Sequence, residues 1–572
     1  MITKPNVKDV KVYECDFLVV GGGDAGCSAA IKAAEEGVNT IVLEKANAAR
    51  SGHSGMGMDH VHDFPRDGVS NLDYMKFFMG RHELLGGPGA LMNPNVGYIL
   101  GARSWWALDH MNRWGFPMKW EDTDDYHWVR NGWFGKKIMI GVHWLDMKPI
   151  MAKKVQESGA LLLNRTMMVD LLTDPNGKVC GATGFNVRTG EFCIVKAKAV
   201  MVSTCNLARN YTSETPMHWK YKMRFHGHPS SISGDGFNAC YKVGAGLCNM
   251  DIATNWNYRI RDDITIPFGS IDHGDGIRGQ WMNAKGEPIP FPTAKMYDEI
   301  EKAGLDPIYC TIEHFNDVYQ KRNEVCIADE RFVSLYLGGQ RGFNPKRHRY
   351  ELMENRRFGF YGLSGVYTDE NFKTDVEGLY CGGDTVLGLG GSGAAIISGL
   401  SVGAQMKEYC EAAPEPVIDY SHVQGVIDEV YAPLFEEDGT EPMELESSIR
   451  YINDRYVSMH ISEGKLKEGL KRLGSLGKHF MPHLMAKTPH DLMRCIEVRN
   501  IFDGSILHIK ACMERKESRG NFIRTDYPER NPENDNHISI CRLVDGKDTI
   551  ELMRAPELKQ EYLEEGRKNE SH

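Results

Sequence analysis

The sequence lacks the cysteine spacing of a metal-cluster protein. Its 572 residues include 14 cysteines, but these are scattered along the chain and none forms a Cys-x-x-Cys pair. Iron–sulfur centres and structural zinc sites need cysteines in close groups. We therefore expect reduced cysteines that are mostly buried and behave as small apolar side chains. If the protein moves electrons, its carrier is something other than its own cysteines.

Long apolar runs and an excess of positive charge are also missing. No stretch approaches the roughly 18 apolar residues that a membrane helix needs. The short run DFLVV near the start lacks the charged region and cleavage site of a secretory signal. The net charge of −11 argues against general binding to nucleic acid or to an anionic membrane. We expect a cytoplasmic protein of several domains, without a membrane span and without a nucleic-acid partner.

Near its start the sequence contains a glycine motif between two apolar strands. The segment CDFLVVGGGDAGCSAAIKAAEEGVNTIVLEKA (15–46) reads as strand, glycine turn, helix and strand. The glycines with GxGxxG spacing are Gly21, Gly23 and Gly26. This spacing allows a tight turn, close approach of the backbone to a pyrophosphate, and close packing of helix on strand. Glu44 ends the second strand, where an acid bonds a ribose hydroxyl. The following Lys45 and the polar stretch RSGHSGMGMDH (50–60) favour FAD over NAD.

Two distant segments support a long dinucleotide lying across a sheet. Residues 164–204 read as strands joined by the turns DPNG and RTG, and the last strand ends at Thr204. The segment TDVEGLYCGGDT (374–385) places Gly383 and Asp384 directly after a short strand. Strand ends of this kind, bounded by glycine and far apart in sequence, suit one extended cofactor.

Together with two further motifs, these segments resemble the flavoprotein subunits of the fumarate reductase and succinate dehydrogenase family. That family includes L-aspartate oxidase and, more distantly, the adenylylsulfate reductase α subunit. The further motifs are SGDGFNACYKVGAG (233–246) and ERKESRGNFIRTDYPERNPEN (514–534), and the resemblance runs from Asp16 to about Glu533. The residues beyond 533 are strongly polar, which is compatible with a tail that reaches a partner subunit.

The resemblance implies an α/β fold. We expect a Rossmann-like FAD-binding domain with an inserted α+β capping domain and a C-terminal helical domain. Apolar residues at helical spacing beyond the proline-marked stretch AAPEPV agree with the last of these. The expected boundaries are 1–233 and 351–412 for the two parts of the FAD-binding domain, 234–350 for the capping domain and 413–572 for the helical domain.

The resemblance also implies which residues contact FAD. They are Gly21, Gly23, Gly26, Glu44, Lys45, Ser51, Gly52, Gly57, Thr204, Asp235, Gly383, Asp384 and Gly393. Many relatives attach FAD covalently through a histidine. Counting back from Gly57 as in the family segment, Ser51 occupies the position of that histidine, and His53 lies two residues later. We therefore expect non-covalent FAD, with His53 as the attachment residue if that prediction is wrong. No metal site is expected.

The stretch HGDGIRGQWMN (273–283) sets an arginine between glycines, which by itself is typical of a solvated surface turn. It resembles the family segment whose arginine delivers a proton to the substrate carbon, and the residue in that place is Arg278. Arginine is a poor acid, so its proton has to move as carbanion charge develops and be resupplied by neighbouring groups. Asp275 is the expected relay partner, and His273, which can titrate near neutral pH, completes the predicted catalytic set.

Two residues that hold a dicarboxylate in the relatives are replaced. Phe360 stands where the family has a histidine, and Gly388 stands where it has an arginine. Each lost charge-assisted contact to a carboxylate costs about 1.5–3 kcal/mol, so succinate and fumarate are not the expected substrates. The flavin-facing glycines Gly390, Gly391 and Gly393 remain. The aromatic-rich region 104–144 either lines the altered pocket or packs in the core or at a subunit interface.

The leading hypothesis is an FAD-dependent oxidoreductase that adds or removes hydrogen across an activated carbon–carbon bond of a small molecule. Because cluster cysteines are missing, its electrons would come from a separate iron–sulfur, ferredoxin-like, cytochrome or quinone-linked subunit, in a hetero-oligomer. One alternative is sulfur chemistry like that of adenylylsulfate reductase, with an iron–sulfur subunit. Another is a flavin subunit that passes electrons between partners without a substrate of its own.

Overall fold

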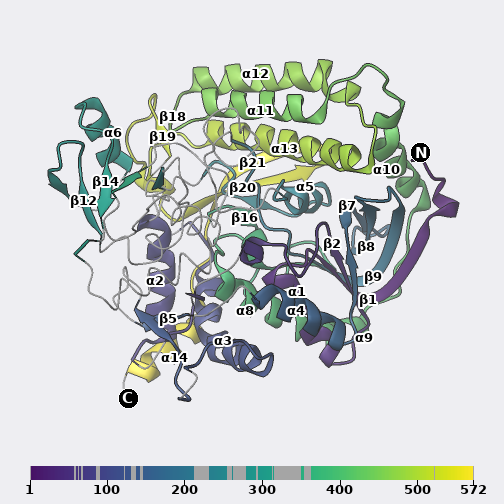
Figure 1. Ribbon diagram of the computed structural model, residues 1–572, viewed down its shortest axis with the longest axis horizontal. Coiled ribbons are helices and arrows are strands. Elements are labelled where there is room, and N and C mark those ends of the chain that lie inside the picture. The colour runs from purple at the N-terminus through teal and green to yellow at the C-terminus, as the bar shows by residue number, and fades with distance from the viewer. Residues whose placement is uncertain are drawn as a thin grey trace, which may run out of the picture.

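The computed structural model describes most of the chain and places the N-terminal and C-terminal parts side by side (Figure 1). The described residues are 2–56, 60–61, 63–65, 68–84, 91–120, 123–130, 137–141, 146–211, 231–253, 260–261, 279–290, 294–311, 313–314, 349–352, 363–520 and 522–570.

A seven-stranded sheet forms the centre of the fold. Its strands are β6 (Leu161–Asn164), β2 (Thr40–Glu44), β1 (Lys11–Val20), β9 (Phe192–Val202), β8 (Val179–Asn186) and β7 (Thr166–Thr173) in spatial order, with β17 (Leu379–Cys381) beside β9. The strands β6, β2, β1, β9 and β17 run parallel, whereas β8 and β7 are antiparallel to their neighbours. β2 is buried throughout, and β1 is mostly buried in its second half. The sequences of these segments are therefore continuous apolar runs, which is typical of parallel strands covered on both faces.

Helices cover one side of the parallel strands (Figure 1). They are α1 (Asp24–Glu35), α4 (Met147–Glu157) and α8 (Ser392–Gly403), with α3 (Pro94–Arg113) and α2 (Asn71–Leu84) behind α8, and α9 (Met406–Ala412) beyond β1. The helices α1 and α8 pack closely because glycines face the contact: a Cβ at Gly399 would overlap the backbone of Ala25. Helices separated by more than 350 residues in sequence thus support the same sheet edge.

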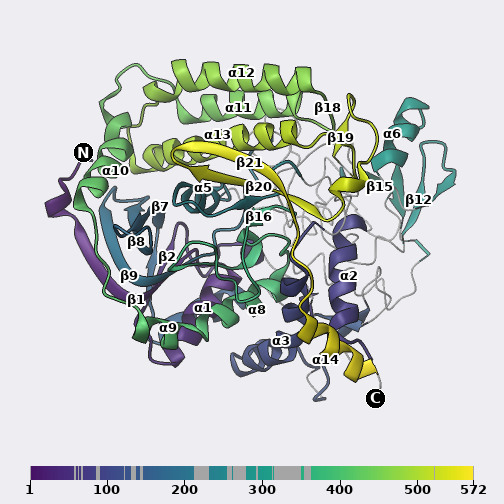
Figure 2. The same cartoon turned by 180° about the vertical axis from the view of Figure 1, so that it is seen from behind.

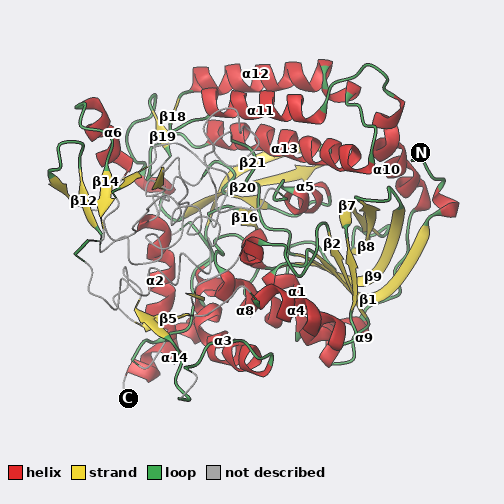
Figure 3. Cartoon of the chain, in the orientation of Figure 1, coloured by secondary structure: helices red, strands yellow, loops and turns green. Residues whose placement is uncertain are grey.

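The C-terminal helices α11 (Pro442–Tyr456), α12 (Glu463–His479) and α13 (Pro489–Glu514) pack on one another along one side of the molecule, with α10 (Tyr420–Tyr431) next to them (Figures 1 and 3). The start of α13 is fixed by a capping box. Thr488 Oγ1 accepts from the Asp491 N–H at 3.2 Å, and the Asp491 carboxylate accepts from the Thr488 N–H at 2.9 Å. The short helix α5 (Asp235–Lys242) lies between α13 and β7.

A second sheet joins the end of the chain to its middle. Its antiparallel strands are β16 (Gly365–Val366), β10 (Leu247–Cys248), β20 (His537–Val544) and β21 (Lys547–Arg554). The final helix α14 (Gln560–Glu570) packs on α2, as seen from behind in Figure 2. Residues 537–570 thus form a hairpin and a helix that pack on the chain itself, with β20 mostly buried and β21 largely exposed, rather than an extended tail. The predicted contact of this end with a partner subunit stays a prediction.

Smaller sheets complete the described structure. One has the strands β11 (Ile260–Arg261), β15 (Tyr350–Leu352), β14 (Tyr309–Thr311), β12 (Gln280–Met282) and β13 (Pro288–Ile289), near α6 (Ala294–Lys302). The others pair β3 (His60–Val61) and β4 (Trp128–Arg130) with β5 (Lys137–Gly141), and β18 (His460–Ile461) with β19 (Ile523–Arg524). In the described part of the chain no helix combines the length and the apolar character needed to traverse a lipid bilayer. The predicted α/β fold with a C-terminal helical region is confirmed.

Candidate functional site

The glycine turn after β1 leaves room for a ligand at one position only. Gly21 has φ +100°, which favours glycine, and a Cβ at Gly26 would overlap the carbonyl oxygen of Gly21. Gly23, the N-cap of α1, has no side-chain cap, and a Cβ there would meet no atom within 4 Å. Gly21 and Gly26 thus bring the helix against the strand, while Gly23 presents open backbone at the helix N-terminus, where an anion is favoured.

Two buried charged side chains hold this turn from either side. Glu44 accepts hydrogen bonds from the N–H of Gly22 at 2.7 Å and of Ala46 at 2.6 Å. Lys148, near the start of α4, donates from Nζ to the carbonyl oxygen of Gly22 at 2.6 Å. Lys148 belongs to no sequence motif, and only its position in the fold brings it to the turn. Its ammonium places positive charge beside the expected pyrophosphate position.

Several buried polar atoms near the turn have no hydrogen-bond partner among the described residues. They are Asp24 Oδ1, Ser51 Oγ and both side-chain polar atoms of Asn206. Asp24 opens α1, and Asn206 follows the end of β9. Gly52, next to Ser51, has φ +78°, and a Cβ there would lie 3.3 Å from Gly23 Cα. Buried polar atoms are normally paired, so this set, together with the open side of Gly23, fits a polar ligand such as FAD.

Lys45 is held by three protein groups. Its Nζ donates to Ser233 Oγ at 3.0 Å, Asp235 Oδ2 at 2.7 Å and Glu497 Oε1 at 2.9 Å. Asp235 also accepts from Ser233 and from Asn500, and Thr204 Oγ1 accepts from the Gly236 N–H at 3.0 Å. These residues tie the end of β2 to α5 and α13. The predicted contacts of Lys45, Thr204 and Asp235 with FAD stay predictions.

A buried charge network extends from Lys45 into the C-terminal helices. Arg209, fully buried, binds Glu497 at 2.6 Å and Glu446 through two nitrogens. Burial alone would raise the pKa of Glu497, but the positive charges of Arg209, Lys45 and Arg494 outweigh it and hold that pKa well below its usual range. The network therefore stays ionised and couples the nucleotide-binding half to the helical half.

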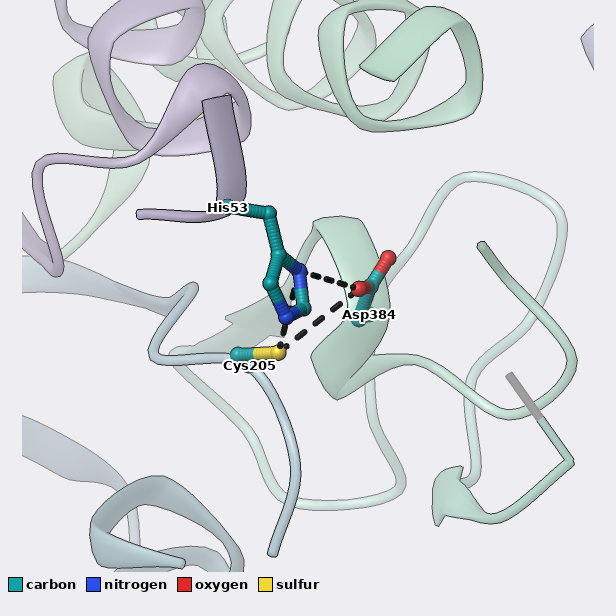
Figure 4. Close-up of side chains that lie close together, drawn as sticks. All are labelled: His53, Cys205 and Asp384. Atoms are coloured by element: carbon teal, nitrogen blue, oxygen red, sulfur yellow. Dashed lines mark hydrogen bonds and ion pairs between the residues drawn. The ribbon is translucent and has the colours of Figure 1, made fainter. Parts of the chain in front are cut away.

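A histidine, a cysteine and an aspartate meet at the carboxyl edge of the parallel strands (Figure 4). His53 lies on a 3₁₀ helix (His53–Met56), Cys205 follows β9, and Asp384 lies on a 3₁₀ helix (Gly383–Thr385) after β17. The His53 Nδ1 atom is 3.2 Å from Asp384 Oδ2 and 3.9 Å from Cys205 Sγ, and Sγ is 3.6 Å from Oδ2. The sequence placed Asp384 and His53 separately in this region but gave no signal for Cys205.

The N-terminus of α8 carries the expected flavin-facing glycines. Gly391 is its N-cap with φ +101°, and Gly393 lies in the first turn. Asp63 Oδ2 accepts from the Ala394 N–H at 2.9 Å and so caps the helix from a distant loop. Asp63 has no signal in the sequence, because a cap supplied from 331 residues away leaves no local pattern.

Gly388, which stands where the relatives have an arginine, has no space for a side chain. Its φ is +80°, and a Cβ there would lie 2.7 Å from Met92 Cε and 3.0 Å from Met92 Cβ. A side chain at this position would be strained by the backbone and would also displace Met92. The local packing therefore requires glycine, and not arginine, at position 388.

Several predicted residues fall outside the described part of the chain. They are His273, Asp275, Arg278, Gly57 and Phe360. The roles given to them by resemblance stay predictions.

The tryptophans of the region 104–144 divide between core and surface. Trp114 is buried and packs edge-on against Phe116, whereas Trp105 and Trp120 are 47% and 57% exposed. Trp114 thus belongs to the core, and a pocket lining formed by the rest of the region stays a prediction.

Comparisons with known proteins agree with this geometry. The profile of the family described as FAD binding domain matches residues 16–257, and that of the fumarate reductase flavoprotein C-terminal region matches 447–564. An uncharacterized FAD-dependent oxidoreductase of Methanocaldococcus jannaschii is 22% identical over 91% of this chain and 94% of its own length. One of the subunits of the fumarate reductase (CoM/CoB) of Methanothermobacter marburgensis is 21% identical over 94% of this chain and 98% of its own length.

Among solved structures, the adenylylsulfate reductase of Archaeoglobus fulgidus has the same fold, with a TM-score of 0.83 over 98% of both chains at 22% identity. The glycine turn with its unpartnered polar atoms and the two family matches lead to one conclusion, and the resemblance and the cofactor expected from the sequence are confirmed. The chain is an FAD-dependent oxidoreductase that belongs to the fumarate reductase and succinate dehydrogenase flavoprotein family.

Proposed function

We propose that this enzyme adds or removes hydrogen across a carbon–carbon bond activated by a neighbouring carbonyl group, as in an enoate, and that its substrate is neither fumarate nor succinate. The exclusion of fumarate and succinate rests on the contact between Gly388 and Met92. A methionine side chain fills the space that a substrate-binding arginine would need, so one of the two carboxylates of a dicarboxylate loses its partner.

FAD, when bound, supplies the hydride chemistry at its N5 atom. The chain's own residues hold and orient the cofactor: the open backbone of Gly23 and the α1 N-terminus face the pyrophosphate, and Glu44 faces a ribose. We propose that the cofactor is held without a covalent bond, because Ser51 replaces the attaching histidine.

Arg278 is proposed to supply or take the proton at the second substrate carbon, with Asp275 and His273 resupplying it. Its guanidinium keeps its proton at neutral pH, so transfer requires carbanion charge to develop on the substrate at the same time. The support for this role is the acid–arginine–glycine segment shared with the family.

Electrons are proposed to come from a separate redox subunit in a hetero-oligomer. Among the described residues, the one group of three metal-binding side chains contains a single cysteine, whereas an iron–sulfur cluster is held by about four. Sulfur chemistry like that of adenylylsulfate reductase is not favoured, because the sequence match to that enzyme's α subunit covers 42% of this chain, whereas the match to the fumarate reductase subunit covers 94%.

The test is anaerobic reoxidation of the dithionite-reduced enzyme by a panel of aliphatic and aromatic enoates, with fumarate and adenylylsulfate included. One enoate should reoxidise the flavin, and fumarate should not. Arg278→Gln should retain FAD but slow that reaction by about 10²–10⁴-fold, the usual contribution of a general acid. Arg472→Gln, a surface arginine paired with Glu468 on α12, is the control and should react normally. Rapid reaction with fumarate, or an unaffected Arg278→Gln, would overturn the proposal.

A further inference from the structure

We propose that the cavity between α10, α12 and α13 binds an amphipathic zwitterion, a small molecule with one ammonium group, one carboxylate and an apolar body, as in an apolar amino acid or dipeptide. The cavity has a volume of about 630 Å³ and is also bordered by α5 and β7 (Figure 1). Its size lies within the range of about 300–1,000 Å³ that is usual for small-molecule sites. This inference does not depend on the reaction proposed above.

The cavity is separate from the cofactor site. Its described lining includes none of the residues expected to contact FAD. One link between the two regions is Asn500, which lines the cavity and donates from Nδ2 to Asp235 Oδ1 at 2.9 Å. Asp235 in turn accepts from Lys45 through its other oxygen. A ligand in the cavity would therefore not compete with FAD for the same side chains.

Six ionisable side chains line the cavity, and four of them form two pairs. His422 Nε2 lies 2.8 Å from Asp170 Oδ2, and this contact raises the pKa of the histidine. Arg499 Nη1 lies 3.3 Å from Glu429 Oε1. These four groups already have partners of opposite charge, so they are not the expected contacts of a charged ligand.

Asp503 and Lys242 are the two remaining ionisable groups of the cavity. Neither has a hydrogen bond or an ion pair within the part of the chain that the structure describes, and they do not pair with one another. Hydrogen bonds between an ammonium and a carboxylate are among the stronger ones in proteins. Two groups of opposite charge that line one cavity without partners therefore match a ligand that carries both charges.

Asp503 is the expected anchor for the ligand's ammonium group. The protein around the cavity desolvates its carboxyl and raises its pKa. The charges of Lys242 and Arg499 favour the ionised form, whereas those of Glu429 and Asp548 oppose it. An ammonium held against the carboxylate would supply the counter-charge in direct contact that the ionised form lacks.

Apolar side chains and an open glycine provide room for the body of the ligand. Val426, Val430, Met481 and Phe502 line the cavity beside the charged groups. Gly425 on α10 also lines it, and a Cβ there would meet no atom within 4 Å. Free space thus begins directly at the helix backbone, and the apolar wall favours an apolar body over a fully polar ion.

The experiment titrates the FAD-loaded enzyme by calorimetry with leucine, phenylalanine, tryptophan, leucyl-leucine and leucyl-phenylalanine. At least one of these zwitterions should bind at one site per chain with a Kd below about 1 mM. Phenethylamine lacks the carboxylate and hydrocinnamate lacks the ammonium group. Both should bind more weakly than the tightest zwitterion, because each can satisfy only one of the two unpaired side chains.

Three variants test the assigned contacts. Asp503→Asn should weaken binding of the tightest zwitterion about tenfold and leave hydrocinnamate unaffected, because it removes the partner of the ammonium group. Lys242→Gln should weaken the zwitterion about two- to fivefold and spare phenethylamine, since Lys242 is exposed. Gly425→Leu should abolish binding, because the new side chain fills the cavity while leucine is a good helix former.

Matched controls make the same changes outside the cavity. Gly474→Leu alters a glycine of α12 where a Cβ also meets no atom within 4 Å, and Asp438→Asn removes an exposed carboxylate. Both controls should bind the zwitterion as the wild type does. Retained FAD absorption and a Tm no lower than that of the wild type show that a variant is folded.

The proposal is overturned if no zwitterion binds, if the singly charged analogues bind as tightly, or if Asp503→Asn or Gly425→Leu binds as well as the wild type. None of these results depends on turnover, so they separate this inference from the proposed reaction.

Discussion

Lys148 Nζ donates to the carbonyl oxygen of Gly22 at 2.6 Å, so a lysine on α4 holds the middle of the glycine turn between β1 and α1. Its side chain is buried, and a buried ammonium is kept where it has polar partners or faces an anion. The Gly22 carbonyl is one hydrogen-bond partner of the Lys148 ammonium, and a pyrophosphate at Gly23 would supply the negative charge that it faces.

We therefore expect Lys148→Met to weaken FAD binding by about tenfold, since a hydrogen bond involving a charged group contributes about 1.5–3 kcal/mol. Methionine keeps the unbranched apolar stem of the lysine side chain without its ammonium, so the helix should pack as before. The measurement is a titration of FAD-free protein followed by flavin fluorescence. Lys153→Met, an exposed lysine on the same helix, is the control. An unchanged affinity for FAD would show that Lys148 only supports the turn.

Gly23 and Gly26 should respond differently to the same substitution. Gly26→Ala would push a methyl group into the Gly21 carbonyl and should lower Tm strongly or prevent accumulation of folded protein. Gly23→Ala meets no protein atom within 4 Å and should leave the free energy of unfolding of the FAD-free protein within about 0.5 kcal/mol of wild type.

The same Gly23→Ala protein should nevertheless lose FAD affinity, because its methyl group occupies the space where the pyrophosphate approaches the backbone. Thermal unfolding without FAD and an FAD titration separate the two effects. Wild-type affinity in Gly23→Ala would place the cofactor away from this glycine.

Glu497→Gln should destabilise the protein by about 3–5 kcal/mol, the usual result of removing one partner of a buried ion pair. The change leaves Arg209 and Lys45 without the carboxylate that both contact. Urea unfolding measures the loss. Glu468→Gln breaks an exposed pair with Arg472 and should cost less than about 1 kcal/mol. Equal effects of the two substitutions would contradict the importance assigned to the buried network.

Asp503 lines a cavity of about 630 Å³ between α10, α12 and α13, together with Lys242, Glu429 and Arg499. The Asp503 side chain is exposed to the solvent of the cavity, and the protein packed around the cavity still desolvates it enough to raise the pKa of its carboxyl to about 6. The unfolded carboxyl titrates near about 3.9. Ionisation of Asp503 is thus less favourable in the folded state than in the unfolded state. The resulting loss of stability is absent below about pH 4 and complete above about pH 6.

Asp503→Asn should therefore stabilise the protein by about 1 kcal/mol near pH 7.5, a value reduced for solvent in the cavity, and the gain should vanish near about pH 4. The measurement is the free energy of unfolding in urea at both pH values, with the exposed Asp438→Asn as control. A gain that is the same at both pH values would show that Asp503 has an ordinary pKa in the folded protein.

Local patterns were enough to predict the nucleotide-binding half. The GxGxxG spacing, the apolar strands and the acid at the end of the second strand gave β1, α1 and β2 with Glu44 at the turn. Apolar residues at helical spacing indicated α12 and α13, because such spacing depends only on neighbours a turn apart. The polar end of the chain was misread, since a hairpin with one exposed strand has a polar sequence although β20 is mostly buried.

The sequence by itself determined the fold class and the cofactor, because the glycine spacing and the order of the strands around it lie in nearby residues. The absence of an arginine at position 388 followed from the resemblance to the family segment. Only the tertiary structure decided which distant side chains meet. Parallel strands end at one edge of the sheet, so the segments after β9 and β17 bring Cys205 to Asp384, 179 residues later, and His53 on its 3₁₀ helix contacts both. Packing likewise set Met92 against Gly388 and Lys148 against Gly22, since contacts between separate elements depend on how those elements dock and leave no periodic trace in the chain.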